Sequence, residues 1–84
     1  MRMDKDWDIK AKRLLQSELT LKGISHERLQ LLLNEIGVNT TKASIDNKIS
    51  RGSFSAAFLL QCLAAIGCEV VNVGRNIGGH NEKR

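Results

Sequence analysis

The chain contains no proline, so its glycines are the main residues that can separate one helix from the next. Gly23, Gly37, Gly52 and Gly67 each follow a segment in which large apolar residues recur at helical spacing. The 84 residues are enough for one compact domain with one core, and too few for a catalytic domain together with a binding domain. The sequence therefore predicts a single all-α domain of four helices.

The first two segments have the pattern of amphipathic helices. An apolar stripe runs from Trp7 to Leu19, with acidic residues in the first turn and basic residues after them, which suits the helix dipole. We expect this helix to start at Asp4 and to end near Lys22. A second helix should follow, with Ser25 as its N-cap and an apolar stripe from Leu29 to Ile36.

The third segment is more polar than the others. Thr40 and Thr41 are alternative N-caps, and Ile45 and Ile49 are its only large apolar residues before Gly52. Because two isoleucines can bury only one narrow stripe, we expect a helix over residues 41–51 that is largely exposed.

The fourth segment is nearly all apolar. It follows the N-cap residue Ser55, covers Ala56 to Ile66 and ends at Gly67. We expect it to be the most buried helix of the domain.

The sequence after Gly67 no longer has a helical pattern. Residues 69–73 include Val70, Val71 and Val73, and their β-branched side chains predict a short strand or an extended tail. A lone strand leaves backbone groups unpaired, so it should pack as a tail or pair with the same strand of a second subunit, forming a homodimer. The domain is thus expected to cover residues 4–73, and residues 74–84, with three glycines and several charges, are expected to be a disordered tail.

The charge balance favours a polyanionic partner without identifying one. There are 13 Lys and Arg against 9 Asp and Glu, a formal net charge of +4. No apolar run is long enough for a membrane span or a signal peptide, so we expect a cytoplasmic protein with no membrane partner. Cys62 and Cys68 form no CxxC motif and have no histidine pair nearby, which predicts free thiols and neither a metal nor another cofactor.

The second helix, the glycine turn and the polar third helix, braced by a helix on each side, are arranged as in a helix-turn-helix domain. Asn can bond the edge of an adenine, while Lys and Arg can reach a guanine or a phosphate. The threonines and the first N–H groups of the helix could hold a phosphate, whereas Asp46 would repel one unless it accepts from cytosine or pairs with Lys42. The candidate DNA-binding residues are Thr40, Thr41, Lys42, Ser44, Asn47, Lys48 and Arg51.

A known sequence pattern covers the third and fourth segments. Its parts here are Asn47-Lys48-Ile49-Ser50-Arg51-Gly52, Ser55, Leu59-Leu60 and Ala65-Ile66-Gly67. Together they resemble the lambda-repressor/Cro type of helix-turn-helix, in which the recognition helix ends in an apolar residue, two polar residues and glycine. The string NKISRGSFSAAFLLQCL, residues 47–63, more closely resembles an uncharacterised family of small bacterial lambda-repressor-like domains, over about residues 14–67. The resemblance implies the fold directly, and DNA binding by analogy.

The second helix departs from the repressor pattern. Leu29 to Ile36 spans seven positions where four is typical, so the turn after it is expected to have a different geometry.

These features predict sequence-specific binding of double-stranded DNA by a transcriptional regulator, a repressor, acting as a homodimer on two half-sites about one helical turn apart. The alternative is a protein-interaction module, such as an antitoxin or a phage or plasmid accessory factor, whose contact surface would be the tail strand. RNA binding is less favoured because the chain offers no exposed aromatic platform for single strands. An enzyme with a small-molecule substrate is not expected, because His26 and His80 are far apart in the sequence and neither lies in a motif.

Overall fold

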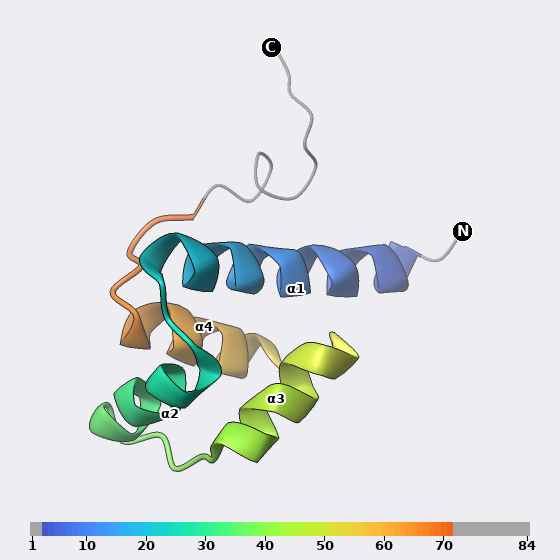
Figure 1. The fold of residues 1–84 in the computed structure, drawn as a ribbon. Coiled ribbons are helices and arrows are strands. Elements are labelled where there is room, and N and C mark those ends of the chain that lie inside the picture. The colour runs from blue at the N-terminus through green and yellow to red at the C-terminus, as the bar shows by residue number, and fades with distance from the viewer. Residues whose placement is uncertain (1–2, 72–84) are drawn as a thin grey trace.

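The protein folds into four α-helices in a computed structural model that describes the backbone of residues 3–71 and the side chains of residues 6–71 (Figure 1). The helices are α1 (Met3–Lys22), α2 (His26–Glu35), α3 (Lys42–Arg51) and α4 (Ala56–Ala65). The prediction of an all-α fold with four helices is confirmed, and each helix begins and ends within about one residue of its predicted position.

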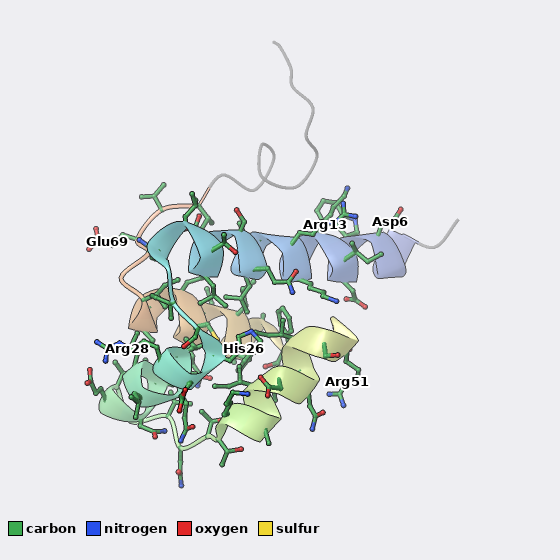
Figure 2. The ribbon with its side chains drawn as sticks, viewed as in Figure 1. Asp6, Arg13, His26, Arg28, Arg51 and Glu69 are labelled. Carbon is green, nitrogen blue, oxygen red and sulfur yellow. The ribbon has the colours of Figure 1, made fainter. Side chains whose placement is uncertain are left out.

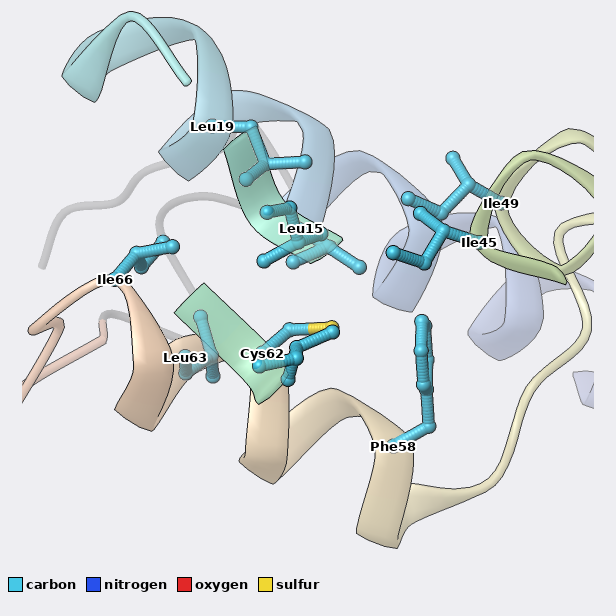
Figure 3. Packing of buried hydrophobic residues seen from close by; sticks show 10 residues of the cluster. Leu15, Leu19, Ile45, Ile49, Phe58, Cys62, Leu63 and Ile66 are labelled. Atoms are coloured by element: carbon cyan, nitrogen blue, oxygen red, sulfur yellow. The ribbon is translucent and has the colours of Figure 1, made fainter. Parts of the chain in front are cut away.

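The helices surround one hydrophobic core. α2 packs against both α3 and α4, and α4 also packs against α1. Leucine, isoleucine, phenylalanine and cysteine side chains from all four helices meet between them (Figure 3). The fully buried members are Leu15, Leu29, Leu33, Ile45, Ile49 and Cys62.

Only the second half of α1 takes part in this core. Leu15 and Leu19 are buried, whereas Trp7 is 52% exposed although it belongs to the same apolar stripe. In Figure 1 the first half of α1 extends past α4, on the side where α3 ends. Trp7 therefore lies beyond the packed region, and the Lys10 ammonium sits 4.5 Å from the centre of its ring.

Side-chain caps define where three of the helices begin. The hydroxyl oxygens of Ser25, Thr41 and Ser55 each accept a hydrogen bond, 3.0–3.1 Å long, from the backbone N–H three residues later. Of the two alternative threonines, Thr41 is therefore the N-cap of α3.

Gly52 ends α3 at a point where the chain passes close to α1. It adopts a left-handed conformation, φ +71°, and its N–H donates to the carbonyl oxygens of Lys48 and Ile49. A Cβ at this position would also lie 3.1 Å from Cδ of Lys12 on α1. A side chain here would thus be strained in its backbone and crowded against α1.

Of the two forms predicted for the C-terminal segment, a strand or an extended tail, the strand is not formed within the described part of the chain. Residues 69–71 make no strand; Val71 packs against the core, and Val70 is 80% exposed. β-branched residues favour a strand only where another strand pairs with the backbone, and within residues 3–71 none is offered. Val73 and the predicted disordered tail, residues 74–84, lie outside the described residues.

The two cysteines are free thiols, as predicted. Cys62 is fully enclosed in the core, and burial raises the pKa of its thiol to about 12. Among the described residues no three His, Cys, Asp or Glu side chains form a metal-binding group. No helix in that part of the chain is long and apolar enough to cross a membrane.

Candidate nucleic-acid interface

α3 is attached to the core along one narrow stripe. Ile45 and Ile49, one turn apart, are 0% and 1% exposed. The opposite side of the helix carries exposed side chains, which we call the outward face: Ala43, Asn47, Ser50 and Arg51. In Figure 2, Arg51 extends from the last turn of α3 away from the other helices. The outward face contains one cation and no acidic residue.

Asp46, the acidic residue of α3, lies on one flank of the helix and has two partners. The Lys42 Nζ donates to Asp46 Oδ2 at 2.8 Å, and His26 Nδ1 lies 2.6 Å from Asp46 Oδ1. An ionised carboxylate only accepts, so Nδ1 carries the hydrogen. His26 is the first residue of α2 and lies between α2 and α3 (Figure 2). The three side chains therefore link the starts of α2 and α3 while they balance the charge of Asp46.

The pairing changes the proton affinities of both α3 residues. The hydrogen bond from Lys42, followed by that from His26, lowers the pKa of Asp46 below its ordinary value of 3.8. The hydrogen bond to Asp46 raises the pKa of Lys42 above 10.5. Both shifts favour the charged forms.

Replacing Asp46 with asparagine is expected to remove one acid-sensitive part of the stability. In the unfolded chain the pKa of Asp46 is about 3.8, and in the folded protein it is lower. The stabilisation that Asp46 gives is therefore fully present above about pH 3.8, and it is lost as the pH falls through the folded-state pKa. Urea unfolding of the wild type and of Asp46→Asn at a series of pH values measures this. The difference in stability between them should shrink on acidification below pH 4, and a constant difference would contradict the pairing.

Lys48 and Ser44 occupy the other flank, toward the start of α4. The Lys48 Nζ donates to Ser44 Oγ at 3.3 Å and lies 5.0 Å from the centre of the Phe58 ring. Both side chains are half-buried. The structure thus places these two predicted site residues at the edge of the outward face, with the ammonium group directed over an aromatic ring of α4.

The segment before α3 is held by two polar residues of α2. Gln30 Oε1 accepts from the backbone N–H of Lys42 at 3.1 Å, and Asn34 Nδ2 donates to the carbonyl oxygen of Val38 at 2.9 Å. Sequence reasoning missed both residues. Nothing in the sequence of α2 separates them from its other polar residues, because their partners lie in the segment that follows α2.

The two threonines have different positions in this segment. The hydroxyl of Thr41 is occupied as the cap of α3, although the residue itself is exposed. The hydroxyl oxygen of Thr40 is enclosed and has no hydrogen-bond partner among the described residues. At the start of α3, Thr41 is therefore accessible to a phosphate, whereas the hydroxyl of Thr40 is not.

The connection between α2 and α3 is longer than the tight turn of a standard helix-turn-helix. α2 ends at Glu35 and α3 begins at Lys42, which leaves six residues, against three or four in that motif. The long apolar stripe of the second helix, from Leu29 to Ile36, predicts an unusual turn after it. α2 itself ends at its predicted place, and the additional length lies in the connection.

The predicted site residues are thus distributed over three positions. Asn47 and Arg51 share the outward face, Lys42 and the pair formed by Ser44 and Lys48 lie on opposite flanks, and the two threonines lie at the start of the helix. Ala43 and Ser50 complete the outward face, and neither is among the DNA-binding residues that the sequence predicts.

Comparison with known proteins identifies the family of the chain. Residues 7–71, from the first half of α1 to the end of the described residues, match the family described as Domain of unknown function (DUF6471). No curated protein and no solved structure matches the chain. Because the match covers most of the sequence and includes the whole of α2, α3 and α4, the chain belongs to the DUF6471 family.

Proposed function

We propose that this protein binds double-stranded DNA sequence-specifically through the outward face of α3, as a cytoplasmic transcriptional regulator that acts as a repressor and a homodimer. The observation that supports this proposal best is the outward face itself. It is exposed and contains no acidic residue, and it lies on a helix whose buried residues are two isoleucines. α3 is about 15 Å long, and the major groove, about 12 Å wide, accepts a helix of this kind.

The side chains of the outward face match the edges of bases in the major groove. Asn47 can form two hydrogen bonds with N6 and N7 of an adenine, and Ala43 offers a methyl group to the methyl of a thymine. Arg51, at the end of the helix, can reach a guanine or a phosphate. We assign base reading to Asn47 and Ala43, and the phosphate contact to Arg51.

The pairing of Asp46 supports this assignment. An unpaired carboxylate on α3 would repel the phosphates on either side of the groove. Asp46 instead accepts from Lys42 and His26, on a flank of the helix rather than on its outward face. Its charge is therefore balanced before DNA approaches.

We further propose that the four helices form a lambda-repressor-like helix-turn-helix, with α2 and α3 as its two central helices. The six-residue connection, its hydrogen bond from Asn34 and the hydrogen bond between Gln30 and the first N–H of α3 support this arrangement of the two helices. We expect α3 to enter the groove at an angle different from that in a repressor with a three- or four-residue turn.

The test combines selection of bound fragments from random DNA with substitutions on the outward face. Asn47→Ala is expected to weaken binding to the selected sequence by about 1–3 kcal/mol and to relax the preference at one base position. Arg51→Ala should weaken binding to all sequences by similar factors, because a phosphate contact carries no sequence information. Fluorescence anisotropy titrations of selected and unselected fragments separate the two effects.

Gln16→Ala, at an exposed position on α1, is the matched control and should bind like the wild type. Selection that enriches no sequence, or unchanged affinity in both outward-face variants, would show that α3 is not the reading helix.

A further inference from the structure

α4 has an exposed side on which no residue is charged. Its buried residues, including Phe58, Cys62 and Leu63, point into the core (Figure 3). Leu60 lies on the opposite side and is 65% exposed. The exposed residues of this side, which we call the α4 face, are Ala56, Ala57, Leu60, Gln61 and Ala64.

The absence of charge separates Leu60 from the other exposed large apolar residues of the described chain. Residues 53–68 contain no Asp, Glu, Lys, Arg or His, in a protein in which 26% of the residues are charged. The other exposed side chains all have a charged residue beside them in the sequence or one helical turn away. They are Trp7, Ile9, Leu21, Leu31, Ile36 and Val70.

This charge pattern suits contact with a second copy of the same chain. Each copy has a formal net charge of +4, so two copies repel one another over most of their surfaces. A two-fold contact also places the same patch against itself, and any charge near the axis then meets a like charge. The α4 face avoids this cost, and its alanines allow the two helix backbones to approach closely around Leu60.

We propose that a second copy of this chain docks on the α4 face, with the two α4 helices crossing at Leu60 about a two-fold axis. This inference rests on the proposed homodimer and assigns its contact surface. It replaces the predicted tail strand as the contact, since residues 69–71 form no strand and Val71 packs against the core of its own chain.

The size of the face determines how strong the dimer is. A ten-residue helix is about 15 Å long, and one side of it buries less than the roughly 800 Å² per partner of a standard interface. The dimer should therefore be weak in free solution and well populated on DNA, where two adjacent half-sites hold the copies at a high local concentration.

The experiment compares two apolar-to-acidic variants in the absence of DNA. Sedimentation velocity and ¹⁵N–¹H correlation spectra of the full chain are recorded from micromolar to millimolar concentration. The wild type should move toward the mass of a dimer, and the amide signals that shift with concentration should be those of the α4 face. Leu60→Glu should weaken this association on the order of a hundredfold, because it brings two like charges together.

Val70→Glu is the matched control, because Val70 is 80% exposed and belongs to the predicted tail strand. It should associate like the wild type. Ala64→Glu, a second substitution on the α4 face, should behave like Leu60→Glu, and circular dichroism checks that each variant keeps its helices. A wild type that stays monomeric at millimolar concentration would overturn the proposal, as would an effect of Val70→Glu larger than that of Leu60→Glu.

DNA binding is measured separately, on fragments from the random selection. If the α4 face is correct and DNA binding is not, the association and its loss in Leu60→Glu persist without any selected sequence. If DNA binding is correct and the α4 face is not, Leu60→Glu binds paired half-sites with the same cooperativity as the wild type.

Discussion

Replacing Ile45 with alanine is expected to lower the free energy of unfolding by about 2–5 kcal/mol. Ile45 is completely buried, and with Ile49 it forms the whole apolar attachment of α3 to the core. The substitution removes three methyl or methylene groups from a packed site and leaves a cavity where α3 meets the other helices. α3 should consequently detach more readily than the rest of the fold.

Urea unfolding, followed by circular dichroism, measures the loss in Ile45→Ala. Ile9→Ala is the matched control, because Ile9 is 42% exposed on α1 and its truncation removes little packing. We expect its stability to lie within about 0.5 kcal/mol of that of the wild type. Equal losses in the two variants would contradict the two-isoleucine attachment of α3.

Raising the salt concentration from about 50 to about 200 mM is expected to weaken DNA binding on the order of a hundredfold. α3 has two cationic side chains that are not paired with its one carboxylate, Lys48 and Arg51, so a dimer brings roughly four to the phosphates. Each neutralised phosphate releases counterions, and this release becomes less favourable as salt rises. A protein-interaction module, with mainly apolar contacts to its partner, would show little dependence on salt.

Anisotropy titrations of a selected fragment at several salt concentrations give the slope of log K against log salt. Arg51→Ala should reduce the size of this slope by about two for a dimer, since each copy loses one phosphate contact. Asn47→Ala, which removes no charge, should lower the affinity and leave the slope unchanged. A flat slope for the wild type would favour the interaction-module alternative over DNA binding.

The boundaries of the helices could be predicted because they depend on interactions within a few residues. Ser25, Thr41 and Ser55 each cap a helix by accepting from an N–H three residues later, and Gly52 ends α3 with a left-handed backbone. The choice between Thr40 and Thr41 could not be made in this way. In the structure Thr41 is the cap, and Gln30, twelve residues before Lys42, accepts from the first N–H of α3, a contact that no local pattern indicates.

The candidate site was predicted less completely than the fold. The helical period correctly places Ile45 and Ile49 inward and Asn47 and Arg51 outward. It does not show that Lys48 lies over Phe58, because that contact joins two helices. Nor does it show that His26, twenty residues away in the chain, reaches Asp46.

By itself the sequence determined the four helices, their caps and the polar character of α3, since spacing and capping act within one or two turns. Only the tertiary structure decided which polar side chains of α3 are left to face a partner. The pair of Lys42 and Asp46 is local to α3, but packing against α2 adds His26 to it, and packing against α4 turns Lys48 over an aromatic ring. The tertiary structure also decided between the two predicted forms of residues 69–71, which make no strand within the described chain, because a strand is stable only when another backbone pairs with it.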